Sequence, residues 1–182
     1  MFRAFLLFCI FSSAISLKAQ TQYLKELQTD TILANDRDIF FTLPYDIADE
    51  NSANRYFTDA NYQYQSGNLV YAANLMKKAI KKQPNRYEYY QLQAFILMDL
   101  GDHKNSVKHA ERAVLLHSGD WKMLYCLALT KYAAKDFLGA NIEYSRALEI
   151  DPAQYLLYEG RAHTKTELND PLGALQDFDL AV

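Results

Sequence analysis

Small residues recur every 34 positions from Ala53 onward, and this repeat restricts the fold more than any other feature of the sequence. When the chain is written in lines of 34 residues, three columns hold a small residue in every line. The columns contain Ala60, Ala94, Ala128 and Ala162; Ala72, Ser106, Ala140 and Ala174; and Ala79, Ala113, Ala147 and Ala181. Such a period is typical of stacked units that each contact only their neighbours. The sequence therefore predicts four similar units with a shared core.

Turn and cap residues divide each unit into two helices. A fourth column holds Asn68, Asp102, Asp136 and Asp170, whose side chains can accept a hydrogen bond from the free backbone N–H groups at a helix start. Gly67 and Gly101 precede two of these caps, where a helix often ends in the left-handed conformation. Asn169 suits the same position, whereas Lys135 suits it less well. Each unit is therefore expected to be a helix, a tight turn and a second helix of similar length.

Large residues and prolines complete the pattern. Tyr56, Tyr90 and Tyr158 stand near the start of first helices, and Pro84 and Pro152 close second helices. With the small-residue columns, this arrangement resembles the tetratricopeptide repeat family. The resemblance covers residues 53–182 in four units, namely 53–86, 87–120, 121–154 and 155–182. It implies an all-α fold, a right-handed α-solenoid of antiparallel helix pairs.

Two regions depart from the repeat pattern. Residues 21–52 do not fit the columns, and their aromatic stretch DIFFTLPYDI contains Pro44, so we expect an N-terminal extension that caps the first unit. The fourth unit ends at Val182 without a polar helix behind it, although solenoids normally need a polar terminal unit for solubility. We therefore expect either a longer natural chain or a partner that covers the last helix.

Residues 1–20 have the layout of a secretory signal peptide. Arg3 precedes a short apolar run, and small residues including Ala14 and Ala19 follow it. The run is too short to span a bilayer, which needs about 20 apolar residues, so no membrane span is expected in the mature chain. An uncleaved anchor and a lipid at Cys9 are the alternatives. We expect export, to the periplasm or cell envelope of a bacterium.

The charge and the cysteines exclude several roles. Removal of residues 1–20 takes away Arg3 and Lys18 and lowers the net charge from −3 to about −5, which disfavours nucleic acid as a partner. The mature chain would keep only Cys126, so no internal disulfide is expected.

No catalytic residue, metal site or cofactor is predicted. The four histidines are scattered along the repeats, and the chain has no glycine-rich phosphate loop and no serine elbow. Glu159, His163 and Glu167 share one helical face at a spacing that metal ligands can use, but a solvated polar face explains them better. The same holds for the basic cluster of Lys77, Lys78, Lys81 and Lys82.

The resemblance implies that the first helices line a concave groove, which is the expected binding surface. The candidate ligand-binding residues are Phe57, Asn61, Tyr64, Phe95, Met98, Lys122, Tyr125 and Tyr132. The alternative reading places some of these aromatic residues in the core between units. One subtype of the family clamps a carboxylate terminus with lysine, asparagine and arginine. Asn61 and Lys122 match that clamp, but Phe57, Leu92 and Cys126 replace its other residues.

The sequence thus predicts a non-catalytic scaffold that binds a protein or peptide in an aromatic groove. Two alternatives remain: the sensory or docking front of a larger enzyme or signalling protein, and a glycan-binding envelope module. The sequence does not indicate the oligomeric state.

Overall fold

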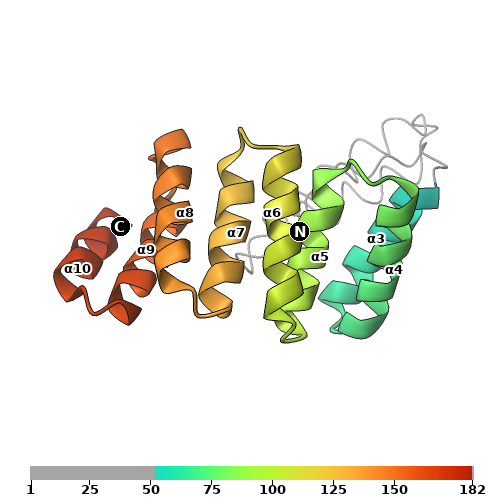
Figure 1. Ribbon diagram of the computed structural model, residues 1–182, viewed down its shortest axis with the longest axis horizontal. Coiled ribbons are helices and arrows are strands. Elements are labelled where there is room, and N and C mark those ends of the chain that lie inside the picture. The colour runs from blue at the N-terminus through green and yellow to red at the C-terminus, as the bar shows by residue number, and fades with distance from the viewer. Residues whose placement is uncertain (1–51, 182) are drawn as a thin grey trace, which may run out of the picture. The chain divides into compact units, whose positions relative to one another are not determined.

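The computed structural model describes residues 52–181, which form eight α-helices with no strand among them (Figure 1). The helices are α3 (Ser52–Gln65), α4 (Leu69–Lys82), α5 (Tyr87–Asp99), α6 (His103–Leu116), α7 (Trp121–Ala133), α8 (Phe137–Ile150), α9 (Tyr155–Glu167) and α10 (Pro171–Leu180). The expected signal peptide and N-terminal extension lie outside the described residues, apart from Ser52. None of these eight helices is long and apolar enough to cross a bilayer.

Consecutive helices pack against each other along the array. Each first helix packs on the second helix of its own pair, α3 on α4, α5 on α6, α7 on α8 and α9 on α10. Each second helix then packs on the first helix that follows, and the first helices also contact one another in order. The expected all-α fold, a solenoid of antiparallel helix pairs, is confirmed.

The small-residue columns lie where the helices approach most closely. All twelve positions except Ala181 are buried. Ser106 replaces alanine in its column because its hydroxyl donates a buried hydrogen bond of 2.8 Å to the carbonyl of Ala94 on the partner helix. Larger side chains at these places would force the helices apart.

Aspartates cap the second helices of the last three pairs. The side chain of Asp102 accepts from the backbone N–H of Asn105, Asp136 from Gly139 and Asp170 from Gly173. The prediction for Asn68 is wrong, because its side-chain amide donates to Gln63 Oε1 at 2.7 Å and caps no N–H of α4. A neutral amide oxygen is a weaker acceptor for the backbone N–H groups at a helix start than a carboxylate oxygen is. The Asn68 amide instead hydrogen-bonds a side chain of the preceding helix.

The turn before each of these caps is left-handed. Gly67 and Gly101 both have φ of +79°, and Asn169 has φ of +59°. Lys135 adopts φ of +63° as well, although this conformation costs a residue with a Cβ about 1 kcal/mol. Its backbone N–H donates to the Tyr132 carbonyl at 2.9 Å and that of Asp136 donates to the Lys131 carbonyl at 2.9 Å, so the helix-ending hydrogen bonds hold the turn in place.

Candidate functional site

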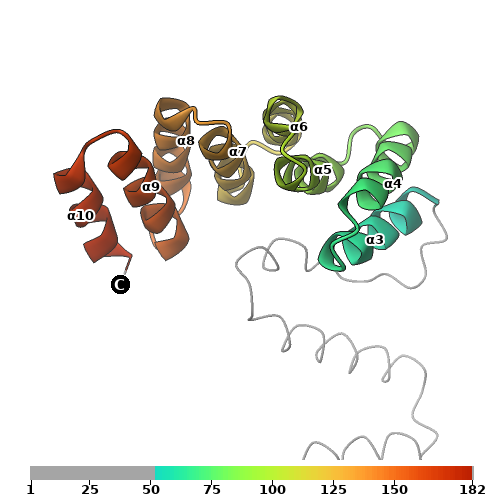
Figure 2. The same ribbon diagram turned by 90° about the horizontal axis from the view of Figure 1, so that it is seen from below.

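The four first helices form a continuous surface, here called the first-helix face. Contacts run from α3 to α5, from α5 to α7 and from α7 to α9, so these helices lie side by side although each pair is separated in sequence by a second helix. Figure 2 shows α3 and α5 on one side of the array and α4 and α6 on the other. All eight residues that the sequence proposed for binding belong to three of these first helices, α3, α5 and α7.

Three of the eight candidates are buried aromatic residues. Phe57 is 6% exposed and stacks on Tyr89 of the next first helix, with ring centroids 5.1 Å apart. Phe95 is 1% exposed, and Tyr125 is 7% exposed with its ring edge-on to Tyr144 at 5.9 Å. The expectation that these rings are exposed is therefore wrong, because they fill the spaces between packed helices. Their part in ligand binding stays a prediction.

The other five candidates are half-buried, and several of them have identified partners or neighbours. They are Asn61 and Tyr64 on α3, Met98 on α5, and Lys122 and Tyr132 on α7. Lys122 places its Nζ 6.0 Å from the centroid of the Trp121 ring, and Tyr132 packs edge-on to Phe137 at 5.3 Å. Because part of each of these side chains is accessible, they offer a mixed aromatic and polar surface to a ligand.

Tyrosine and carboxylate side chains pair across neighbouring units of this face. The hydroxyl of Tyr64 donates to Asp99 Oδ2 at 2.8 Å. Tyr132 and Glu167 are related by the same separation of 35 residues, and the pKa of Tyr132 is raised by burial, by the negative charge of Glu167 and by a hydrogen bond with it. We call Tyr64–Asp99 and Tyr132–Glu167 the two tyrosine–carboxylate pairs.

Two polar atoms on α3 and α5 are buried without a hydrogen bond. Among the described residues, neither Gln91 Nε2 nor Asn61 Oδ1 has a hydrogen-bond partner, and Gln91 as a whole is only 3% exposed. Gln91 lies on the same stripe of α5 as Glu88 and Phe95, three residues after one and four before the other. A buried amide without a hydrogen-bond partner lowers stability, so Gln91 is a costly residue at this place in α5.

Comparison with known proteins identifies the architecture. By sequence, the chain matches no family model and no curated protein. By structure, it is similar to MamA, with a TM-score of 0.67 and 17% identity over 74% of this chain and 78% of that one. It is also similar to the first TPR of Spaghetti (RPAP3) bound to the HSP90 peptide SRMEEVD, with a TM-score of 0.62 and 17% identity over 66% of this chain and 96% of that one. A third similar structure is YrrB, a TPR protein with an unusual peptide-binding site, with a TM-score of 0.64 and 18% identity over 72% and 69% of the two chains.

The helix pairs, their 34-residue period and these three structural similarities all indicate the same fold. The fold is that of the tetratricopeptide repeat. Within this repeat fold, three positions of the carboxylate clamp lack the polar or charged residues that the clamp needs. Phe57, Leu92 and Cys126 stand where that subtype has lysine, asparagine and arginine, respectively, and all three side chains are buried. Burial also raises the pKa of the Cys126 thiol well above its usual range, which keeps it protonated and unreactive.

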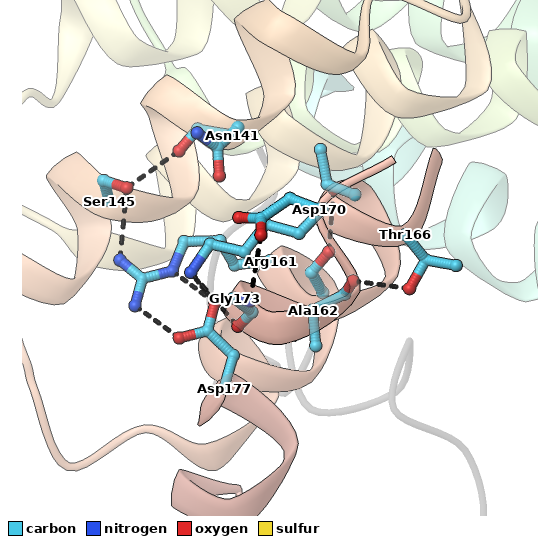
Figure 3. Close-up of polar contacts among 11 residues, drawn as sticks. Asn141, Ser145, Arg161, Ala162, Thr166, Asp170, Gly173 and Asp177 are labelled. Atoms are coloured by element: carbon cyan, nitrogen blue, oxygen red, sulfur yellow. Dashed lines mark hydrogen bonds and ion pairs between the residues drawn. The ribbon is translucent and has the colours of Figure 1, made fainter. Parts of the chain in front are cut away.

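A buried ionic network joins the last two repeats. Asp177 on α10 is 2% exposed and accepts two hydrogen bonds from Arg161, at 2.7 and 2.8 Å, while Lys165 Nζ lies 2.8 Å from it (Figure 3). Arg161 also donates to Ser145 of α8 at 3.2 Å, so one guanidinium connects three helices. Because the carboxylate is already paired with two cations of the same chain, we interpret the network as structural.

The preceding repeat contains a related network at equivalent positions. Glu143 accepts from Lys131 at 2.7 Å and from Arg146 at 2.6 Å. Lys131 and Lys165 are 34 residues apart, as are Glu143 and Asp177. Neither network was predicted, because the columns that defined the repeat hold small, capping, aromatic and proline residues. Columns of opposite charge at the same 34-residue spacing are the signal that indicates them.

The structure also places the histidine and lysine patterns noted in the sequence. Among residues 52–181, no group of three or more histidine, cysteine, aspartate or glutamate side chains is arranged to hold a metal ion. His163, the centre of the spacing considered above, instead packs edge-on against Phe178 at 5.2 Å. The four lysines of α4 are exposed, and Lys78 lies over the Tyr56 ring at 5.5 Å.

Proposed function

We propose that this protein is a non-catalytic scaffold that binds a peptide or protein segment on its first-helix face. The main observation is that five half-buried side chains of mixed chemistry belong to α3, α5 and α7, first helices that contact one another in order. Aromatic residues such as Tyr64 and Tyr132 supply contact area at a low cost in conformational entropy. The peptide bound by the Spaghetti repeat and the peptide-binding site of YrrB support a ligand of this class.

Exchange of Met98 and Tyr132 for alanine tests the proposal. The partner is first captured from cell extract with the full chain, and its affinity for purified variants is then measured by calorimetry. The double variant is expected to bind at least tenfold more weakly, because it loses two partly exposed contacts that together contribute at least about 1.4 kcal/mol.

A matched control changes large side chains away from the proposed surface. Tyr71 on α4 and Leu115 on α6 are 56% and 76% exposed, and both belong to second helices. Their exchange for alanine should leave both affinity and helical content unchanged. If instead this control variant loses the partner while Met98→Ala/Tyr132→Ala retains it, the binding surface lies on the second helices.

We also propose that the protein acts after export, in the periplasm or envelope of a bacterium. The support is the sequence of residues 1–20, with an early arginine, a short apolar run and small residues near Ala19. Mass spectrometry of the protein from its native cells should find an N-terminus between Leu17 and Thr21. Recovery of the chain with Met1 intact would contradict export by a cleaved signal.

A further inference from the structure

Seven basic side chains are exposed on the second helices of the first two repeats. Figure 2 shows these two helices, α4 and α6, on the same side of the array. Glu111 is the one acidic residue within them. We call the seven residues the outer basic face; they are Lys77, Lys78, Lys81 and Lys82 on α4 and Lys104, Lys108 and Arg112 on α6.

The chain does not neutralise the charge of the outer basic face. In the described part of the chain, no ion pair joins any of the seven to a carboxylate. Lys78 lies 5.5 Å from the centroid of the Tyr56 ring, a contact that leaves its positive charge in place. Arg112 lies over the Tyr90 ring in the same way, at 5.9 Å. Lys131 of the third repeat, by contrast, pairs with a buried carboxylate at 2.7 Å. An anionic partner would therefore complement the charge of α4 and α6.

Large aliphatic side chains occupy the equivalent exposed positions of the third repeat. Leu138 of α8 has the place of Lys104 in the repeat, and Ile142 has that of Lys108. The two aliphatic side chains are 67% and 57% exposed. Val70 has the place of Leu138 in the first repeat and is 66% exposed, so exposure here is a property of the position in the repeat. The side of the array that presents the cations thus also presents aliphatic groups to solvent.

Cations beside exposed aliphatic groups have the chemistry of a membrane contact. Lysine and arginine near an anionic bilayer add to its attraction for a protein, and aliphatic side chains gain free energy at the boundary between headgroups and acyl chains. Six of the seven cations are lysines, which act as point charges, whereas recognition of single carboxylate or phosphate groups favours the planar fork of arginine. A bilayer of many anionic headgroups therefore fits this face better than an acidic protein segment.

We propose that the outer basic face docks the repeat array on an anionic lipid bilayer, with Leu138 and Ile142 entering the boundary between headgroups and acyl chains. The face belongs to second helices, on the other side of the array from α3 and α5 (Figure 2). Docking of this kind leaves the first-helix face available to the proposed peptide or protein partner.

Lysine acetylation in the presence of vesicles tests the proposal at the face itself. The full chain is acetylated alone, with vesicles of phosphatidylcholine, and with vesicles that also contain phosphatidylglycerol, and mass spectrometry identifies the modified residues. The anionic vesicles should slow modification of Lys81 and Lys108 severalfold. Lys135, which is exposed in the turn before α8, should react at the same rate throughout. Raised salt should remove the protection, because it screens exposed charges.

Co-sedimentation of variants with the anionic vesicles measures the contribution of charge. Lys81→Gln/Lys108→Gln should bind about 30-fold more weakly, because it loses two of the cations. The control Arg55→Gln/Lys135→Gln removes the same charge from exposed positions outside the face and should bind almost as the parent chain does. All variants retain residues 1–20, so any binding by that apolar run is common to them.

A second pair of variants measures the aliphatic contribution. Ile142→Gln should weaken binding to the anionic vesicles about fivefold, because the exposed part of an aliphatic side chain no longer leaves water. Tyr155→Gln is the control, since Tyr155 is 51% exposed but belongs to the first helix α9. Its affinity for the vesicles should not change.

The proposal is overturned if anionic vesicles leave the modification of Lys81 and Lys108 unchanged, or if neutral vesicles protect them equally. Equal losses in either variant and its control would also overturn it. Protection by a soluble peptide of glutamates at lower concentration than by anionic vesicles would overturn it in favour of an acidic protein partner. Failure here is separate from failure of the proposed function, because the loss of the captured partner in Met98→Ala/Tyr132→Ala is measured without lipid.

Discussion

Replacement of Asp177 with alanine is expected to lower the free energy of unfolding by about 3 kcal/mol, because it leaves Arg161 and Lys165 without their buried counter-charge. The carboxylate is 2% exposed, and it is held by two hydrogen bonds from the guanidinium and by the lysine at 2.8 Å. The side chains of the two cations are 19% and 20% exposed, so water relieves part of the cost and the lower end of the usual range applies.

Urea unfolding followed by circular dichroism, together with hydrogen exchange of α9 and α10, measures this effect. Exchange is informative because stacked repeats can open locally at one end of the array. Asp179→Ala is the matched control, since Asp179 lies on the same helix and is exposed, and its loss should change stability by less than about 0.5 kcal/mol. If Asp177→Ala increases the exchange rate, relative to the parent chain, more in α3 and α4 than in α9 and α10, a local role for Asp177 is contradicted.

The same carboxylate gives the stability a defined pH dependence. Burial by itself raises the pKa of Asp177, but hydrogen bonds and positive charge from Arg161 and Lys165 outweigh it, so the pKa is lower in the folded chain than in the unfolded chain. The unfolded state therefore binds the proton more tightly, and stability falls as the pH drops. The contribution should be complete above about pH 4 and lost progressively below it. Asp177→Asn should flatten this part of the stability profile relative to the parent chain.

Gly160→Ala is expected to destabilise the array by about 2 kcal/mol, although glycine to alanine usually stabilises the middle of a helix by about 1 kcal/mol. A Cβ at Gly160 would lie 2.5 Å from two ring carbons of Tyr144 and 2.6 Å from its hydroxyl oxygen. Tyr144 is 1% exposed and packs against Tyr125 at 5.9 Å, so its ring has little room to move. The clash therefore outweighs the gain in helix propensity.

A double-mutant cycle with Tyr144→Leu isolates the contact. In the Tyr144→Leu background, where the side chain is smaller, the added methyl group should cost much less, which gives a coupling energy of about 1–2 kcal/mol. Gly119→Ala is the control, because a Cβ there meets no atom within 4 Å and its φ lies outside the left-handed region. Thermal unfolding measures all four proteins of the cycle. A higher melting temperature for Gly160→Ala than for the parent chain would show that the ring adapts.

The fold was largely predictable because its signals are local or strictly periodic. Ala128 must be small wherever two helices meet closely, and Asp136 caps whichever helix follows it, so neither depends on distant parts of the chain. Lys135 was the weakest of the turn residues, and the backbone hydrogen bonds around it hold the left-handed turn nevertheless. Asn68 failed as a cap because Gln63, five residues away, bonds its side chain instead.

The candidate site was less predictable, because exposure depends on how neighbouring repeats pack. Helical spacing assigned Phe57 and Tyr132 to the same face, but packing against Tyr89 buries the Phe57 ring, whereas the Tyr132 ring, edge-on to Phe137, stays half-buried.

The sequence by itself determined the period, the number of helices in each unit and most of the caps, since these depend on side-chain size and on bonds within a few residues. Tertiary structure alone decided which rings are accessible and which charges are neutralised. Contacts such as Tyr64 with Asp99, Arg161 with Asp177 and Tyr144 with Gly160 join residues 16 to 35 positions apart, and their energies depend on distances that only the stacked helices set.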